Sequence, residues 1–210
     1  MKKIIAKNLL EINAVFLSPN KPFTWSSGIK SPIYCDNRLI LSYPKIRNLI
    51  KNTLAETLQQ HFPDCQYIMG TATAGIAHAA LVADILELPM GYVRTSSKTH
   101  GRLNAIEGKV IKDSRVVVIE DLISTGGSSL KVVKALEEAG FIVLGVLSIF
   151  NYNLSEADGK FKDNNVIYKS ISDYNTLIEV AVEMNYIDKQ DISKLKQWKN
   201  NPYNQDWINA

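Results

Sequence analysis

Cysteine and histidine are scarce in this chain, and neither is spaced for a metal site or a disulfide framework. The two cysteines, Cys35 and Cys65, form no CxxC pair, and the three histidines, His61, His78 and His100, show no spacing such as HExxH. Neither a disulfide scaffold nor a zinc site is therefore expected. A small buried thiol is the favoured interpretation of Cys35, although it could also lie near a pocket.

The sequence also lacks a strong charge and a long apolar run. Lys and Arg number 24 against 21 Asp and Glu, so no field of the kind that drives nonspecific nucleic-acid binding is implied. The apolar N-terminal stretch is interrupted by Lys7, Glu11 and Asn13, which favours a short amphipathic helix over a signal peptide. We therefore expect a cytoplasmic protein without a nucleic-acid or membrane partner.

No internal repeat or low-complexity linker divides the chain. Its 210 residues, 46% of them hydrophobic, suit one domain with a single sizeable core. We expect residues 1–210 to form this domain, with a core at about 43–150. The segments at about 1–42 and 151–200 are expected to form a small cap, and Trp207 could dock the Asn-rich tail.

The middle of the chain alternates short β-branched runs with helix-length amphipathic stretches. This pattern is typical of an α/β fold, a central parallel sheet flanked by helices. Helices are expected at 43–62, 74–88 and 128–140, and strands at 67–70, 90–94, 115–121 and 141–150. Residues 116–119 are apolar without alternation, so their strand should be central and covered on both faces.

The flanking segments carry further elements. Residues 23–36 read as a strand or hairpin, 165–171 as a strand, and 174–184 and 191–200 as helices. These are the elements expected to build the cap.

The segment at 116–129 is the most informative part of the sequence. A buried strand leads to the adjacent acids Glu120 and Asp121, and a loop of Ser, Thr and Gly then opens a helix. Gly126 and Gly127 allow the backbone to approach a phosphate, and the N–H groups at the helix start can bind its oxygens. No Lys follows the glycines as it does in a P-loop, so a monophosphate fits better than ATP.

The two acids extend this interpretation from a phosphate to a sugar phosphate. Glu120 and Asp121 would lie one sugar's width from the phosphate and could accept hydrogen bonds from two neighbouring ribose hydroxyls. In the simpler alternative, Asp121 or Ser124 caps a helix and the glycines form a tight turn. The co-occurrence of strand, acids and loop favours a site for phosphoribosyl pyrophosphate (PRPP).

Two other segments could contact anions. Residues 70–76 join a strand end to a helix with P-loop-like glycine spacing, but Ile76 stands where a P-loop has lysine, and a plain helix start explains them equally well. The polar segment 94–108 carries Arg94, Lys98 and His100, whose charges suit a pyrophosphate. A solvated basic loop remains the alternative for this segment.

Five segments together resemble the orotate phosphoribosyltransferases, which are type I phosphoribosyltransferases. They are residues 23–38, 70–83, 92–101, 116–129 and 145–153, reading FTWSSGIKSPIYCDNR, GTATAGIAHAALVA, YVRTSSKTHG, VVVIEDLISTGGSS and GVLSIFNYN. The resemblance implies the type I phosphoribosyltransferase fold and a Mg²⁺-dependent transfer of ribose 5-phosphate from PRPP to orotate in pyrimidine biosynthesis. It also implies a homodimer in which loop 94–108 reaches the neighbouring active site.

The resemblance also implies roles for individual residues. Lys98, His100 and Asp121 would be catalytic, and Ser124 would contact orotate; no residue is assigned to Mg²⁺, which PRPP itself would mainly hold. The implied PRPP-binding residues are Arg94, Lys98, His100, Glu120, Asp121, Leu122, Ile123, Ser124, Thr125, Gly126, Gly127 and Ser128.

The chain departs from some branches of the family at four positions. Ser26, Ala74 and Thr95 stand where those branches carry lysine, and Tyr152 stands where some relatives present an arginine to orotate. The orotate carboxylate would then be met by backbone amides or by a basic residue of segment 23–38, Lys30 or Arg38.

Two rival functions remain open. A purine or uracil phosphoribosyltransferase would share the PRPP segment, whereas segments 23–36 and 94–101 favour orotate. A PRPP-sensing regulator that binds nucleic acid could dispense with Lys98 and His100, which this chain retains.

Overall fold

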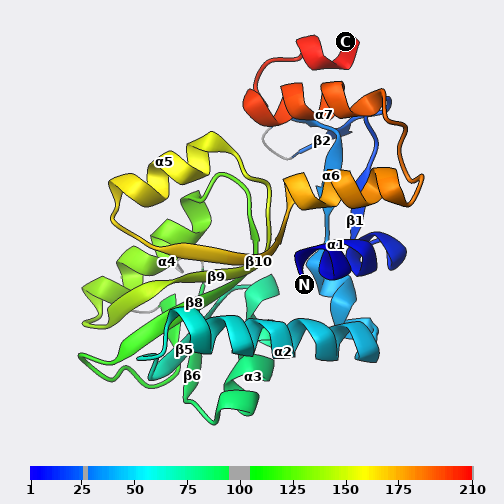
Figure 1. The fold of residues 1–210 in the computed structure, drawn as a ribbon. Coiled ribbons are helices and arrows are strands. Elements are labelled where there is room, and N and C mark those ends of the chain that lie inside the picture. Colours follow the sequence, from blue (N-terminus) through cyan, green and yellow to red (C-terminus); the bar gives the residue numbers. More distant parts are fainter. Residues whose placement is uncertain (26–27, 95–104, 210) are drawn as a thin grey trace.

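A six-stranded sheet forms the centre of the molecule in the computed structural model, which describes residues 1–25, 28–94 and 105–209. The strands lie in the order β10-β9-β8-β5-β6-β7, and all of them pair in parallel except β7 at one edge, which is antiparallel (Figure 1). Their bounds are β5 (Tyr67–Thr71), β6 (Met90–Val93), β7 (Ile106–Glu107), β8 (Arg115–Ile123), β9 (Ile142–Asn151) and β10 (Tyr168–Asp173). The predicted parallel sheet is confirmed.

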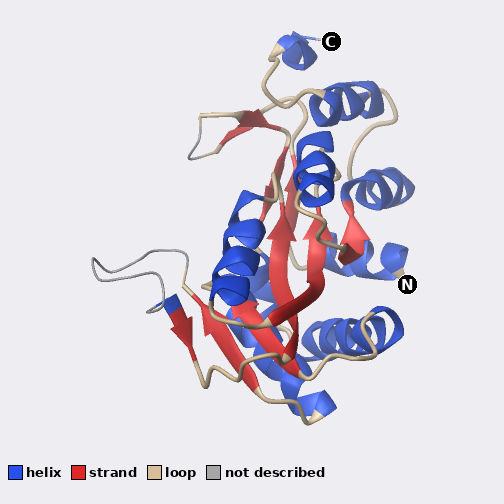
Figure 2. Cartoon of the chain, turned by 90° about the vertical axis from the view of Figure 1, so that its left-hand side faces the viewer, coloured by secondary structure: helices blue, strands red, loops and turns tan. Residues whose placement is uncertain are grey.

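Helices cover both faces of this sheet (Figure 2). On one face, α2 (Pro44–His61) packs against β9 and β10 and α3 (Ala74–Leu86) against β5 and β8; on the other, α4 (Gly127–Glu138) packs against β8 and β9. A further helix, α5 (Ser155–Asp163), lies against α4. The predicted arrangement, a sheet flanked by helices, is thereby confirmed.

The central strand β8 explains why the core has two halves. Val117 and Ile119 join the apolar cluster on the side of α2 and α3, whereas Val116 and Val118 join the cluster on the side of α4. All four side chains are fully buried. The continuous apolar run in the sequence therefore marks a strand covered on both faces, as predicted.

The two ends of the chain pack together. The N-terminal helix α1 (Lys2–Glu11) contacts α6 (Tyr174–Glu183) and β10, and Lys2 forms an ion pair of 2.6 Å with Asp173. The indole Nε1 of Trp198, in α7 (Asp191–Asn200), donates to the backbone oxygen of Lys30 at 3.1 Å. The terminal segments share one apolar cluster with the sheet, and the division into core and cap stays a proposal.

The rest of the N-terminal segment forms short elements. Two antiparallel pairs, β1 (Val15–Leu17) with β4 (Ile33–Cys35) and β2 (Phe23–Thr24) with β3 (Lys30–Ser31), precede the 3₁₀ helix η1 (Asn37–Ser42). The expected strand or hairpin at 23–36 is thus several short strands. No helix in the described parts of the chain has both the length and the apolar character to cross a bilayer.

Several elements were not expected from the sequence, whereas the docking of Trp207 was. The strand β7 and the helix α5 are additional elements, and β8 continues two residues past Asp121. In the tail, Trp207 is 2% exposed and belongs to the 3₁₀ helix η3 (Asp206–Asn209). An indole buries enough apolar area to hold this short segment against the core.

Candidate active site

The turn from β8 into α4 has the geometry of an anion site. Gly126 adopts φ +77°, a left-handed conformation that favours glycine, and a Cβ there would lie 3.0 Å from the Phe161 ring. The first helical hydrogen bond is donated by Leu130, so the N–H groups of the preceding helical residues have no intrahelical acceptor. A Cβ on Gly127 would meet nothing within 4 Å, so the first residue of α4 borders open space.

The two adjacent acids occupy different environments. Glu120 is 4% exposed and accepts hydrogen bonds from the Ser129 hydroxyl (3.0 Å) and from the Asp121 backbone N–H (3.1 Å). Burial, reinforced by the neighbouring Asp121 charge, raises the pKa of Glu120 to about 8. Asp121 is only half-buried. Of the two, Asp121 is the carboxylate accessible to a ribose, and Glu120 braces the start of α4.

Leu122 and Ile123 differ in the same way. Ile123 is 1% exposed and packs in the cluster on the α4 side, so only its backbone can face a ligand. Leu122 points the other way and lines a pocket. The alternation along β8 therefore places one of these two side chains at the site and the other in the core.

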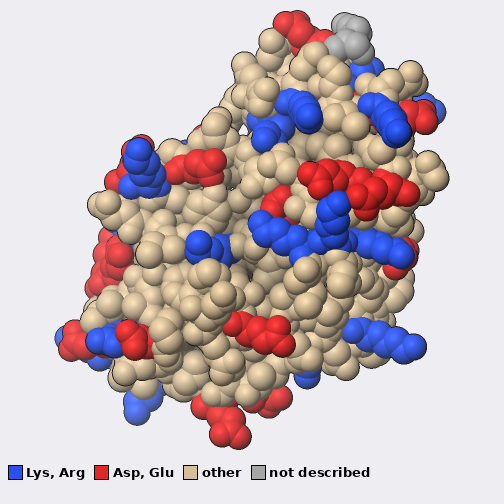
Figure 3. All heavy atoms as spheres, in the orientation of Figure 1, with Lys and Arg blue, Asp and Glu red and all other residues tan. Residues whose placement is uncertain are grey.

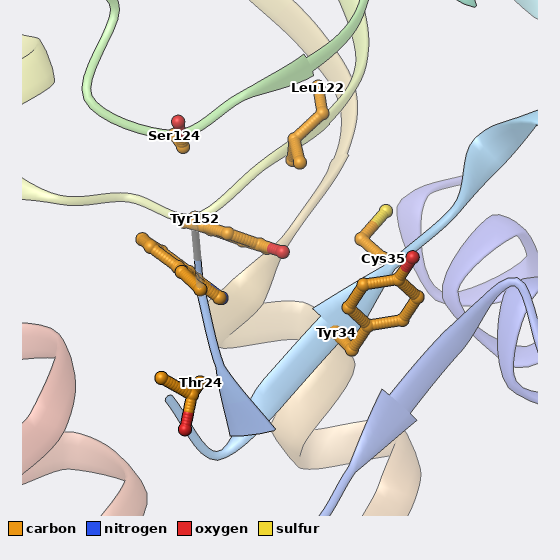
Figure 4. Close-up of a pocket in the computed structure, with 7 residues that line it drawn as sticks. Thr24, Tyr34, Cys35, Leu122, Ser124 and Tyr152 are labelled. Carbon is orange, nitrogen blue, oxygen red and sulfur yellow. The ribbon is translucent and has the colours of Figure 1, made fainter. Parts of the chain in front are cut away.

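An aromatic pocket of about 370 Å³ adjoins the end of β8 (Figure 4). It unites residues from three distant parts of the chain, so no spacing in the sequence predicts it. Its lining residues are Thr24, Trp25, Tyr34, Cys35, Leu122, Ser124 and Tyr152. Ser124 and Leu122 belong to the segment around the anion site, and the pocket and the anion site are therefore neighbours.

Stacked rings form one wall of this pocket. Trp25 and Tyr152 stack with centroids 5.5 Å apart and planes inclined by 18°, and Trp198 meets both rings edge-on. Burial raises the pKa of Tyr152 well above its ordinary value, which keeps the phenol protonated. Figure 4 shows its hydroxyl directed toward Tyr34 and Cys35. Sequence reasoning noted Tyr152 only as a departure and missed Trp25 and Tyr34.

Cys35 lies at the pocket rather than deep in the core. The residue is half-buried and lines the aromatic pocket, so the alternative of a cysteine near a pocket is confirmed. Burial and the nearby charges of Asp121 and Asp36 raise the pKa of Cys35 well above its ordinary value, so the group is a neutral thiol.

The two candidate basic residues of the N-terminal segment already have partners. Arg38 forms a two-pronged contact with Asp36, with Nε–Oδ1 and Nη2–Oδ2 distances of 2.6 and 2.8 Å. The Lys30 ammonium donates to the Thr24 hydroxyl at 2.8 Å. Thr24 lines the aromatic pocket, whereas Lys30 and Arg38 do not. Lys30 is thus linked to the pocket only through Thr24.

The turn from β5 into α3 is shaped by packing. A Cβ at Gly75 would lie 2.6 Å from the Ile119 oxygen, and one at Gly70 would lie 3.0 Å from the Ala79 Cβ. These glycines allow α3 to approach β5 and β8 closely. The P-loop-like spacing thus has a structural cause that does not require a phosphate.

The ends of the loop at 94–108 are held together by the pairing of β6 with β7. Val93 in β6 lies opposite Ile106 in β7, and the Arg94 guanidinium pairs with Glu107 at 3.2 Å. Lys98 and His100 lie outside the described residues, as do Ser26 and Thr95.

The acidic residues at this site suit a metal ion that is held mainly by a bound substrate. No group of three or more His, Cys, Asp or Glu residues within the described ranges could hold a metal ion. Asp121 is one accessible carboxylate, and Glu120 is directed into the protein. Mg²⁺ commonly uses one or two carboxylates together with substrate phosphates. The site therefore fits Mg²⁺ carried by a diphosphate, and Asp121 would be the carboxylate that accepts hydrogen bonds from its bound water.

The fold and the paired anion and ring sites define a phosphoribosyltransferase. Residues 39–186 match the family model for the phosphoribosyl transferase domain. The orotate phosphoribosyltransferase of Bacillus cereus (strain B4264) is 58% identical over 210 residues, covering 100% of both chains. This chain belongs to the orotate phosphoribosyltransferase family.

Solved structures agree with this assignment. The orotate phosphoribosyltransferase of Aeropyrum pernix is 30% identical with a TM-score of 0.76, over 88% of this chain and 99% of that one. A UMP synthase of Leishmania donovani is 26% identical with a TM-score of 0.81, over 94% of this chain and 42% of the longer protein.

Proposed function

We propose that this protein transfers the ribose 5-phosphate group of PRPP to a ring nitrogen of orotate, in pyrimidine biosynthesis. The products are orotidine 5'-monophosphate and pyrophosphate. The observation that carries the proposal is the adjacency of an open helix start, an accessible carboxylate at Asp121 and an aromatic pocket. A phosphosugar and a flat ring could thus bind side by side. Ser124 belongs to the loop before α4 and also lines the aromatic pocket.

The reaction is a displacement at the anomeric carbon. The bond from this carbon to the pyrophosphate oxygen breaks, the bond to the orotate nitrogen forms, and the proton of that nitrogen passes to water or to the pyrophosphate product. No protein nucleophile is needed. The enzyme holds the reactants in line and neutralises the departing charge.

Each part of PRPP is assigned a place in this proposal. The 5'-phosphate would bind the N–H groups of Ser124–Ser129, and Asp121 would accept a ribose hydroxyl. Arg94, Lys98 and His100 would surround the pyrophosphate, and bound Mg²⁺ would neutralise part of its charge. Because Lys98 would act on charge that develops in the transition state, Lys98→Ala should lower kcat by about 100-fold. Unchanged kcat would remove Lys98 from the mechanism.

The aromatic pocket is proposed to hold orotate. Its ring would lie against the wall formed by Trp25 and Tyr152, and the protonated Tyr152 hydroxyl would donate to an orotate oxygen. Tyr152→Phe keeps the stack and removes one hydrogen bond, so the KM for orotate should rise about tenfold while the KM for PRPP stays constant. An equal rise in both constants would place orotate elsewhere.

The proposal includes a homodimer with the loop 94–108 reaching the neighbouring site. In support of this proposal, the pairing of β6 with β7 brings the two ends of the loop together, with Val93 opposite Ile106. A mixed dimer of Lys98→Ala and Asp121→Asn subunits should regain one intact site per dimer and show turnover; absence of turnover would contradict shared sites. A cytoplasmic location also belongs to the proposal, because charged substrates cross a membrane only at high energetic cost.

A substrate panel decides between this function and its rivals. Product formation from PRPP and Mg²⁺ is measured with orotate, hypoxanthine, adenine and uracil, and turnover of a purine or uracil without orotate would overturn the choice. Nucleic-acid binding without turnover would support a PRPP-sensing regulator. On the face drawn in Figure 3, however, Lys and Arg are interspersed with Asp and Glu. Lys3, for example, pairs with Glu183 at 2.7 Å.

A further inference from the structure

Asp121, the proposed ribose-binding acid, lies just beyond the residues where β5 pairs with β8. β5 pairs with β8 only as far as Ile119, opposite Gly70. Beyond this point β8 continues beside β9 alone, from Glu120 opposite Ser148 to Ile123 opposite Asn151. One side of the backbone at Asp121 thus lacks the ladder that fixes the preceding residues.

The side chain of Asn37 takes over at this edge. Its Nδ2 donates to the backbone oxygen of Asp121 at 2.7 Å, across a separation of 84 residues. Asn37 is fully buried at the start of η1, a helix that packs against both α3 and β8. The Asn37 amide therefore supplies a hydrogen bond to the β8 backbone at a point where β5 no longer pairs with it.

A second buried polar residue, His78 of α3, forms a hydrogen bond with the backbone of Asn37. It is 1% exposed, and the glycine at position 75 allows its helix to contact β8. Burial lowers the pKa of His78, and the Asp121 charge and a hydrogen bond to the Asn37 backbone raise it only in part. The imidazole is therefore neutral near pH 7, and it does not compete with a ribose as a cationic partner for the carboxylate.

These side chains are not explained by stability alone. Among the described residues, the Oδ1 of Asn37 and the Nε2 of His78 are buried atoms without a hydrogen-bond partner. Such atoms are rare in folded proteins, and each costs about 1–3 kcal/mol.

We propose that Asn37 and His78 are positioning residues that hold Asp121 ready for the ribose of PRPP. Asn37 fixes the backbone of Asp121 beyond the end of β5, and His78 supports Asn37 through the hydrogen bond to its backbone. The proposal rests on the proposed function, since it concerns the same carboxylate. A carboxylate fixed in advance loses less conformational freedom when PRPP binds.

The test uses Asn37→Leu and His78→Leu, which remove the polar atoms and approximate the volume. Calorimetric titration with PRPP and Mg²⁺, without orotate, should show about tenfold weaker binding for each variant. The KM for PRPP should rise in parallel, while the KM for orotate stays within about twofold of the wild type. Asn37→Asp, which keeps the shape but loses the donor, provides a second variant if Asn37→Leu fails to fold.

Thr53→Val is the matched control. Thr53 is a buried residue of α2 whose hydroxyl donates to the Leu49 oxygen at 2.9 Å, away from Asp121. It should lose stability without losing affinity for PRPP. If the Asn37 and His78 variants behaved like this control, the positioning role would be refuted. If wild-type protein failed to convert orotate in the same assay, the proposed function itself would fail.

Discussion

The two strand-to-helix turns at the carboxyl ends of β5 and β8 look alike in sequence and differ in structure. Each carries two glycines and lies beside the other in the sheet. At β8, Gly126 has a positive φ and Gly127 faces open space, whereas a Cβ at Gly75 would press on the Ile119 oxygen at 2.6 Å. Glycine spacing alone therefore does not show whether a turn needs glycine for ligand binding or for close packing of a helix.

The largest expected effect comes from closing the open space at β8. Gly127→Glu places a carboxylate where the 5'-phosphate would bind, and PRPP affinity should fall about 100-fold or more because like charges repel. The fold should persist, since an acid is favourable in the first turn of a helix. Calorimetric PRPP titration measures the loss. Gly159→Glu, in α5 with equally open space, is the control, and equal affinities in both variants would move the phosphate elsewhere.

The acid that follows β8 should give the next largest effect. Asp121→Asn removes a charged acceptor from the ribose, worth about 1.5–3 kcal/mol, so kcat/KM for PRPP should fall about 10- to 100-fold. Asp84→Asn makes the same change on the exposed side of α3, after the other turn. Steady-state kinetics of both variants measure the difference, and equal activities would contradict a role for Asp121.

The β5 turn should respond in stability. Gly75→Ala forces a methyl group against the Ile119 oxygen, so the free energy of unfolding should fall by about 1–3 kcal/mol. Gly127→Ala, which meets no neighbour, should change it by less than about 0.5 kcal/mol. Urea denaturation measures both. A Gly75→Ala protein as stable as the wild type would show that packing does not require this glycine.

The buried acid Glu120 at the β8 turn should give stability a pH dependence. Because the pKa of Glu120 is about 8 in the folded protein and near 4.5 otherwise, the folded state keeps a proton that the unfolded chain has lost. Stability should therefore fall as pH rises from about 5 to 8. Relative to Glu120→Gln, the wild type should lose at least about 1.4 kcal/mol over this window, measured by urea denaturation. Parallel pH curves would refute a protonated Glu120.

Long periodic segments allowed most of the fold to be predicted from sequence. The run at 116–119 identified the central strand because a strand covered on both faces needs no polar alternation. The strand β7 has two residues and is defined by pairing with β6, so it has no pattern of its own. The helix α5 buries only Ala157 and Phe161, too few apolar positions for a recognisable stripe.

The site was predictable only where its residues are contiguous. The anion turn follows from residues 120–129 because strand, acids and glycines occur in one segment. The ring pocket joins Trp25, Tyr34 and Tyr152, which meet only through folding. Asn37 and His78 are isolated polar residues in sequence, and their importance depends on where the pairing of β5 with β8 ends.

All three tryptophans, Trp25, Trp198 and Trp207, lie in the terminal segments, and two of them belong to the stacked wall of the ring pocket. The intrinsic tryptophan fluorescence of the protein should therefore report binding of the ring acceptor rather than of PRPP. Emission excited in the indole band should change when a flat acceptor enters the pocket and respond little to a phosphosugar alone. Stopped-flow fluorescence on the unlabelled protein could thus determine which substrate binds first.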